Sequence, residues 1–202
     1  MAKGSFALDI QQIRKRARAH MEDGAVTSKY GADRQTVLKL LNEALATEIV
    51  CTLRYKRHSF MAQGLSSKSV AAEFAEHARE EQGHADLIAA RITQLDGEPD
   101  FNPAGLATRS HSEYVEGEGL VDMIKENLIA ERIAIDTYGE IIRYLGNDDP
   151  TTRVMFESIL ATEEEHAEDM LDLLGHLGAV ASAPASETER TNGGPKGATA
   201  RG

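Results

Sequence analysis

The sequence predicts an all-α fold in which four long helices form an antiparallel bundle of two helical hairpins, joined by a long crossover. Two observations lead to this fold class. The composition favours helix over sheet, because aromatic residues make up only 5% of the 202 residues and tryptophan is absent. In addition, apolar residues recur at alternating steps of three and four along four long segments, which is the spacing of one face of an α-helix.

The four segments cover about residues 35–63, 66–96, 117–146 and 149–177. Turn-forming residues separate the members of each pair, at residues 64–67 (Gly-Leu-Ser-Ser) and 146–150 (Gly-Asn-Asp-Asp-Pro). The link at residues 97–116 is different, since about 20 residues is long for a connection within a compact domain. An extended link of that length spans more than the roughly 45 Å of a helix of about 30 residues. It can therefore run the length of the bundle.

We expect one helical domain at residues 34–178, flanked by two extensions. Residues 1–33 form an N-terminal extension, which includes a short helix starting near Leu8 and the basic residues Arg14, Lys15, Arg16 and Arg18. Residues 179–202 form a disordered tail, because they offer too little apolar surface to offset the entropy lost on ordering.

Charge and cysteine content exclude several classes of protein. A formal net charge of −11 argues against a general nucleic-acid binder. The single cysteine, Cys51, rules out an intrachain disulfide and a cysteine-rich zinc or iron–sulfur site built by one chain, and it fits a reducing compartment. Neither a signal-peptide pattern nor a stretch of roughly 18 apolar residues is found, so we expect a soluble, cytoplasmic protein.

An acidic residue interrupts each apolar stripe near its middle. These residues are Glu48, Glu81, Glu131 and Glu163, one in each expected helix. A charged side chain that faces a bundle core is costly unless it is paired or bound to metal. Because all four residues fall near mid-helix, we expect them to meet at one level of the bundle.

Histidines accompany two of these acids at helical spacing. His84 follows Glu81 by three residues, and His166 follows Glu163 by three residues, so each pair shares one helix face. One Glu-x-x-His on an acidic helix is weak evidence, because charged helix faces are usually solvated. Two such motifs together with two further stripe glutamates indicate a metal site.

The two halves of the sequence repeat this pattern. Glu48 and Glu81 are 33 positions apart and Glu131 and Glu163 are 32 apart, while Tyr55 and Tyr138 each follow the first acid of their hairpin by seven. This spacing predicts an internal pseudo-two-fold symmetry. At such positions the tyrosines are either core residues or donors of a hydrogen bond that orients a ligand carboxylate.

Four carboxylates and two imidazoles suit a pair of first-row divalent ions. Iron or manganese suits these ligands better than copper or an all-sulfur zinc site, and open positions would remain for dioxygen or peroxide. We therefore name Glu48, Glu81, His84, Glu131, Glu163 and His166 as candidate metal ligands and catalytic residues. His77 also lies on a stripe, but it has no symmetric partner, and we interpret it as a hydrogen-bonded core or edge histidine.

The same residues resemble the bacterioferritin branch of the ferritin-like superfamily, which includes Dps-like proteins. The similarity covers about residues 33–177. Its motifs are Leu41-Asn42, Glu48, Tyr55 and His58 in the first helix, Glu81-x-x-His84-Ala85-Asp86-x-Ile88-x-x-Arg91-Ile92-x-x-Leu95-x-Gly97-x-Pro99 in the second, and Ile159-Leu160-x-x-Glu163-Glu164-x-His166 in the fourth.

The resemblance implies a ferritin-like di-iron domain. Glu48, His84 and Glu81 would bind one side of the centre, and Glu131, His166 and Glu163 the other, with Glu81 and Glu163 bridging. The implied activity is that of a ferroxidase, which oxidises Fe(II) with dioxygen or peroxide and stores the ferric product in a hollow shell of identical subunits.

Two positions depart from the bacterioferritin pattern. Bacterioferritins ligate haem with a methionine directly after the first Glu of Glu-x-x-His, and Gln82 stands there in this sequence, so we expect no haem. The helix that follows the bundle in 24-subunit ferritins also has no clear counterpart after Leu177. A 12-subunit or 24-subunit shell and a smaller assembly therefore all stay open.

Two alternatives to a storing ferroxidase follow from the sequence. One is a small di-metal oxidase or peroxidase that keeps the site without the store. The other is a Dps-like protein that protects DNA through the basic N-terminal extension, although we favour a solvated arm. A native mass together with the metal content distinguishes a dimer with about two irons per chain from a hollow shell loaded with far more.

Overall fold

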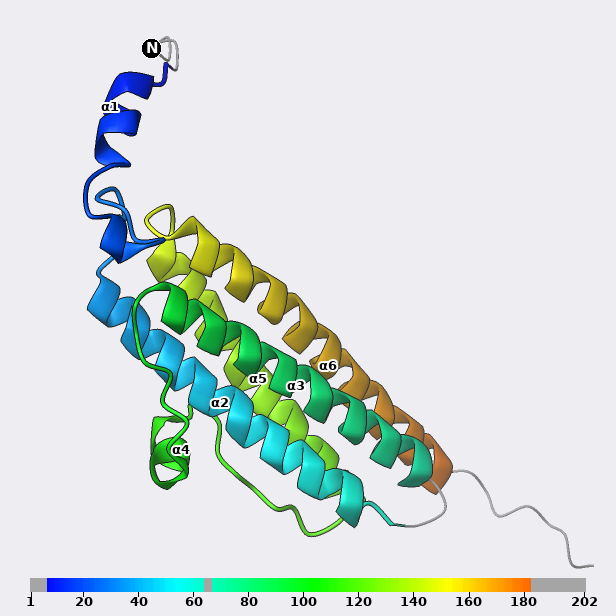
Figure 1. The fold of residues 1–202 in the computed structure, drawn as a ribbon. Helices are drawn as coiled ribbons and strands as arrows, with labels where there is room; N and C mark the ends of the chain where they lie inside the picture. The colour runs from blue at the N-terminus through cyan, green and yellow to red at the C-terminus, as the bar shows by residue number, and fades with distance from the viewer. Residues whose placement is uncertain (1–6, 64–66, 183–202) are drawn as a thin grey trace, which may run out of the picture.

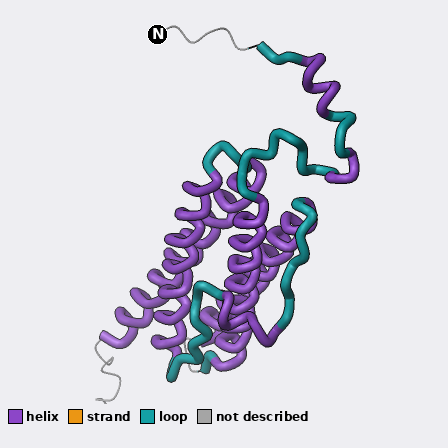
Figure 2. The backbone as a smooth tube through the Cα atoms, turned by 90° about the vertical axis from the view of Figure 1, so that its left-hand side faces the viewer, coloured by secondary structure: helices purple, strands orange, loops and turns teal. Residues whose placement is uncertain are grey.

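The computed structural model describes residues 7–63 and 67–182. Within these ranges, the long helices are α2 (Arg34–Met61), α3 (Ser67–Gln94), α5 (Leu120–Leu145) and α6 (Pro150–Ser182). They lie side by side along one axis, with α2 packed against α3 and α5 against α6 (Figure 1). The prediction of an all-α bundle made of two hairpins and a crossover is confirmed, and Figure 2 shows helices and loops but no strand in the part described.

Local sequence explains where the long helices begin and end. The carboxylate of Asp33 accepts a hydrogen bond from the backbone N–H of Thr36 at 2.8 Å and so caps α2. Gly146 ends α5 with a φ of 48°, a left-handed conformation that favours glycine. Pro150 is the first residue of α6, a position at which the missing amide hydrogen of proline costs no helical hydrogen bond. Gly146 and Pro150 thus set the turn between α5 and α6.

The crossover follows α2 along most of its length, as its hydrogen bonds show. Taken in chain order, they join Asp100 to Asn42, His111 to Thr47, Glu113 to Arg54 and Glu116 to His58. From Asn42 to His58 is about 24 Å of helix. Two short elements that the sequence did not predict interrupt this link, the 3-10 turn η2 (Pro103–Gly105) and helix α4 (Leu106–Arg109), which lies against the outside of α2 (Figure 1).

The hydrophobic core consists of two main clusters separated along the bundle axis. The first includes Leu41, Ile88 and Phe156, and the second includes Phe74 and Met170. All five side chains are fully buried. The level between the two clusters is the level of the four stripe glutamates, so apolar layers enclose these acids from both sides.

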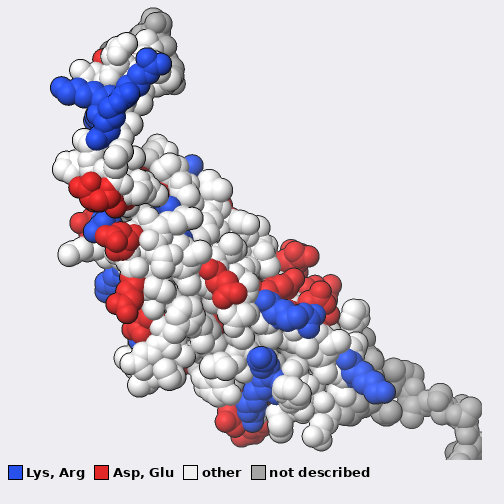
Figure 3. Space-filling view, in the orientation of Figure 1, with Lys and Arg blue, Asp and Glu red and all other residues white. Residues whose placement is uncertain are grey.

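The N-terminal extension extends beyond the end of the bundle. It contains helix α1 (Ile10–Arg16), which has no buried residue, and a 3-10 turn, η1 (Met21–Asp23). Figure 3 shows the basic side chains of this extension gathered well away from the bundle, in keeping with Arg14, Lys15 and Arg16 in the last turn of α1. None of the described helices has the length and apolar character needed to cross a membrane.

The C-terminal boundary differs from the sequence prediction. Helix α6 continues to Ser182, beyond the expected end near Leu177, which is consistent with the two alanines of the intervening residues. The rest of the tail expected at 179–202 lies outside the described residues, as does any helix that would follow the bundle.

A buried ion pair holds the α5–α6 turn against α3. Asp149 accepts hydrogen bonds from Arg91 at 2.9 Å, from the backbone N–H of Thr152 at 3.0 Å and from the Tyr30 hydroxyl at 2.8 Å. Burial alone would raise the pKa of Asp149, but the bonds from Thr152 and Tyr30 and the charge of Arg91 outweigh burial and lower it. The stabilisation is therefore complete above the ordinary carboxyl pKa and is lost as the pH falls through the lowered value.

Replacing Asp149 with alanine should lower the free energy of unfolding by about 3 kcal/mol, because it leaves Arg91 buried without its partner and removes the cap of α6. Chemical denaturation at pH 7 measures this loss. The variant Asp148→Ala is the matched control, since Asp148 is exposed. Equal stability of the two variants would contradict the assigned role of Asp149.

Candidate metal centre

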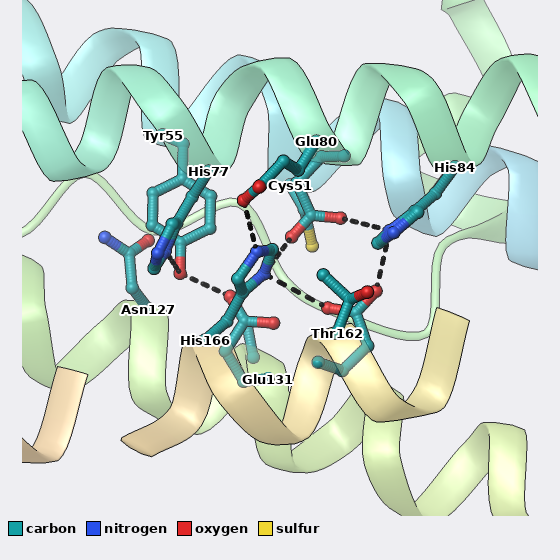
Figure 4. A network of polar contacts seen from close by, with 12 residues as sticks. Cys51, Tyr55, His77, Glu80, His84, Asn127, Glu131, Thr162 and His166 are labelled. Atoms are coloured by element: carbon teal, nitrogen blue, oxygen red, sulfur yellow. Dashed lines mark hydrogen bonds and ion pairs between the residues drawn. The ribbon is translucent and has the colours of Figure 1, made fainter. Parts of the chain in front are cut away.

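The four stripe glutamates meet at one level of the bundle. Glu48 comes from α2, Glu81 from α3, Glu131 from α5 and Glu163 from α6, and each is at most 1% exposed. Figure 4 shows the surroundings of this cluster, with side chains converging from all four helices. The structure therefore brings together the acids that the sequence places near mid-helix.

The two histidines lie on either side of the same cluster. The Nδ1 atom of His84 is 2.9 Å from Oε1 of Glu163 and 3.7 Å from Oε2 of Glu81. The Nδ1 atom of His166 is 3.6 Å from the other oxygen of each carboxylate, Oε2 of Glu163 and Oε1 of Glu81. Glu81 and Glu163 thus present one oxygen toward each histidine.

The six side chains form two overlapping groups of ligand atoms. Within each group, the candidate ligand atoms lie within 4.8 Å of one another. The first group consists of Glu48, Glu81, His84 and Glu163, and the second of Glu81, Glu131, Glu163 and His166. Glu81 and Glu163 belong to both groups. The arrangement can therefore hold two ions that share two carboxylates.

A tyrosine holds one oxygen of each of the two remaining carboxylates. The hydroxyl of Tyr138 donates to Oε1 of Glu48, and the hydroxyl of Tyr55 donates to Oε1 of Glu131. Burial, together with the nearby carboxylates, raises the pKa of both tyrosines, so each keeps the proton that it donates. The two bonds are equivalent under the pseudo-two-fold symmetry that the sequence predicts, because each joins a tyrosine of one hairpin to a glutamate of the other.

Several buried atoms at the centre form no well-aligned hydrogen bond among the described residues, although each histidine Nδ1 lies within 3.7 Å of carboxylate oxygens. They are Oε2 of Glu48, Oε1 of Glu81, Nδ1 of His84, Oε2 of Glu131, both carboxylate oxygens of Glu163 and Nδ1 of His166. Leaving buried polar atoms unpaired is costly, and charged atoms cost the most. A pair of divalent ions with nitrogen and oxygen ligands supplies what these atoms lack, so the residues present fit such a pair.

The cluster shifts the pKa values of its own members. Burial, and then the charges of Glu81 and Glu163, raise the pKa of both Glu48 and Glu131 well above the ordinary value. Burial would lower the pKa of the histidines, but the carboxylates that face their Nδ1 atoms outweigh it and raise the pKa of His84 to about 12 and that of His166 to about 11. Without a bound cation, protons on these groups offset the buried negative charge.

Three polar side chains near the centre were not predicted as part of it. Arg54 is 1% exposed and donates to Oδ1 of Asn127 at 2.9 Å, which places a cation beside the centre. Glu80 lies 2.8 Å from Nε2 of His166 and orients that ring (Figure 4). Their signal in the sequence is weak, because Arg54 and Glu80 fall beside the apolar stripes rather than on them.

His77 is buried, and its ring stacks on the ring of His166 (Figure 4). The two ring centroids are 3.9 Å apart and the ring planes differ by 19°. Nδ1 of His77 also lies 3.3 Å from the hydroxyl of Tyr55. The structure therefore places this histidine directly next to the candidate ligands, outside the two groups that form the centre.

The fold and the buried cluster define a class of protein, the four-helix bundles whose core holds carboxylate and histidine metal ligands. Comparison with known sequences narrows this class. Residues 38–180 match the sequence profile of the ferritin family, described as a ferritin-like domain. The chain therefore belongs to the ferritin family.

Individual relatives agree with this assignment. The chain is 34% identical over 150 residues to the bacterioferritin of Mycobacterium avium, an alignment that covers 70% of this chain and 87% of the relative. It is 32% identical over 145 residues to the DNA protection during starvation protein of Pyrococcus furiosus, covering 70% and 78% of the two chains. Among solved structures, a dodecameric thioferritin, the bacterioferritin-related protein of Bacteroides fragilis, superposes with a TM-score of 0.72 at 33% identity and covers 75% of this chain and 91% of its own.

Binding of divalent ions at this cluster should release protons. At pH 7 both His84 and His166 are protonated, and a histidine must be neutral to ligate a metal. We expect at least about two protons released per pair of ions, and an affinity that falls as the pH is lowered. Calorimetric titration with Zn(II) in buffers of different ionisation enthalpy measures this number. The exposed Gln82→Ala variant should behave like the unaltered chain, whereas a binding heat independent of buffer would contradict the protonation assigned here.

Proposed function

We propose that this protein is a ferroxidase that oxidises Fe(II) to Fe(III) at a dinuclear site within each chain and stores the product in a shell of identical subunits. Membership of the ferritin family supports iron oxidation and storage as the general function. The observation that carries the dinuclear assignment is the pair of overlapping ligand groups that share Glu81 and Glu163.

In this proposal Glu48 and His84 bind one ion, Glu131 and His166 bind the other, and Glu81 and Glu163 bridge the two. The distances support the bridging role, because each of these two carboxylates presents one oxygen toward each histidine. Nitrogen and oxygen ligands of this kind suit iron and also manganese. Fe(II) is the substrate that the family assignment favours.

The reaction is balanced by the two ions together. Two Fe(II) ions give up two electrons, which reduce one dioxygen and two protons to hydrogen peroxide, or one hydrogen peroxide and two protons to two waters. Bound iron supplies this redox chemistry, and the side chains hold the ions close enough for both electrons to reach one oxidant. Shared carboxylates fix the spacing of the two ions, while Tyr55 and Tyr138 orient the carboxylates that are not shared.

The surroundings of the centre favour oxidation over loss of the ion to water. Apolar clusters above and below the centre limit access along the bundle axis. In such surroundings, negatively charged ligands stabilise the higher charge of Fe(III) more strongly than they would in water. Arg54 partly offsets the negative charge on one side.

Storage in a shell is the part of the proposal that rests on relatives. Bacterioferritins align with 70% of this chain, and a dodecameric relative shares its fold. A specific observation also favours DNA protection as a second candidate. The basic helix α1 projects from the bundle, where repeated copies on a shell could contact a polyanion (Figure 3), and one relative is named for DNA protection during starvation.

The variants Glu81→Ala and His166→Ala should each lower the rate of Fe(II) oxidation by more than about 100-fold, since even partners of metal ligands are worth about 10- to 100-fold. The rate is followed by the absorbance of Fe(III) and by oxygen consumption. Gln82→Ala, next to Glu81 but exposed, is the matched control and should keep the full rate. Unchanged turnover in the first two variants would rule out the proposed site.

A further inference from the structure

A second cluster of potential ligands lies beside the centre, between α3 and α6. It consists of Glu73 and His77 on α3 and Asp169 on α6, whose ligand atoms lie within 4.8 Å of one another. Nε2 of His77 is 3.4 Å from Oδ2 of Asp169 and 3.6 Å from Oε1 of Glu73. For comparison, two ligands about 2.1 Å from one ion are about 3.0 Å apart at a right angle and about 3.4 Å apart at the tetrahedral angle.

Hydrogen bonding directs the free nitrogen of His77 into this cluster. The hydroxyl of Tyr55 gives its proton to Glu131, so it can only accept from Nδ1 of His77. A neutral His77 with its proton on Nδ1 has its lone pair on Nε2, the form in which imidazole binds metals. That lone pair faces two carboxylates, so either a proton or a metal cation must lie between Nε2 and the acids.

The burial and the charge of these three side chains also suit a site that binds cations from solvent. The side chain of His77 is 2% exposed, whereas Glu73 and Asp169 are 38% and 41% exposed. Within residues 7–63 and 67–182, neither acid forms an ion pair with a lysine or arginine. The cluster therefore has a rigid buried nitrogen and two acids that reach water.

The bundle itself does not require a histidine here. His77 precedes Glu81 by four residues, and the residue four before Glu163 is Ile159, which is buried in the first hydrophobic cluster. The pseudo-two-fold symmetry thus places an apolar side chain at the equivalent position. Among the described residues, this polar cluster is found on one side of the centre only, next to His166.

We propose that Glu73, His77 and Asp169 form a third metal site, which binds one divalent ion of a first-row transition metal, such as Fe(II). Water completes the coordination, since only one nitrogen and two carboxylates come from the chain. The ring of His77 stacks on that of His166, so an ion held here is one side chain away from the dinuclear centre. Its role as a holding site for ions moving between solvent and that centre rests on the proposed ferroxidase function, whereas the site itself does not.

The test counts bound ions with Co(II), a probe that dioxygen-free buffer keeps in one oxidation state. The double variant Glu73→Gln/Asp169→Asn is compared with Glu168→Gln/Asp172→Asn, which makes the same charge change at two exposed positions of α6. Equilibrium dialysis of the full chain at about 0.1 mM free Co(II) fills any site of micromolar affinity. The double variant should bind about one Co(II) per chain fewer than the control.

Two outcomes would overturn the proposal. Equal binding by the two double variants would show that the cluster is not a site, and a loss of two or more ions would show that the acids only support the dinuclear centre. Repeating the comparison in a chain that also carries Glu131→Ala and Glu163→Ala separates the two proposals. The difference of about one ion should persist there even if the dinuclear assignment is wrong.

Discussion

Mutual repulsion among four buried carboxylates is the constraint on which the rest of this structure depends. Two unit charges 4 Å apart interact by about 4 kcal/mol at an effective dielectric constant of 20, so Glu48, Glu81, Glu131 and Glu163 cannot all be charged without cations among them. The histidines and the tyrosine hydroxyls reduce this repulsion, and the raised pKa values of Glu48 and Glu131 are its consequence. In a ferroxidase, the same repulsion favours binding of the substrate ions, because they bring positive charge among the carboxylates.

Packing along the whole length of the bundle offsets the electrostatic cost of burying these carboxylates. Two apolar clusters on either side of the acids hold the helices together without help from the centre. Hydrogen bonds join the crossover to α2 from Asn42 to His58, and the Asp149–Arg91 pair fixes the turn between α5 and α6 against α3. The backbone can therefore keep the ligands at close distances whether protons or metal ions balance their charge.

Much of the fold and of the candidate site could be predicted from the sequence because both depend on helical periodicity. An acid at a stripe position, as with Glu48, signals a buried charge, and three-residue spacing places His84 beside Glu81. The environment of His77 could not be predicted in the same way. Its partners Tyr55, Asp169 and His166 come from two other helices, so their meeting depends on rotation and depth within the bundle. Helix α4 was missed because a four-residue helix has no periodicity to detect.

The central claim is that each chain holds two ions between shared carboxylates. Anomalous diffraction at the iron edge, from crystals loaded with Fe(II) without oxygen, tests this claim most directly. Two iron peaks are expected at the dinuclear centre, one beside His84 and one beside His166, with Glu81 and Glu163 contacting both. A single peak at the centre, or iron bound only at the surface, would contradict it.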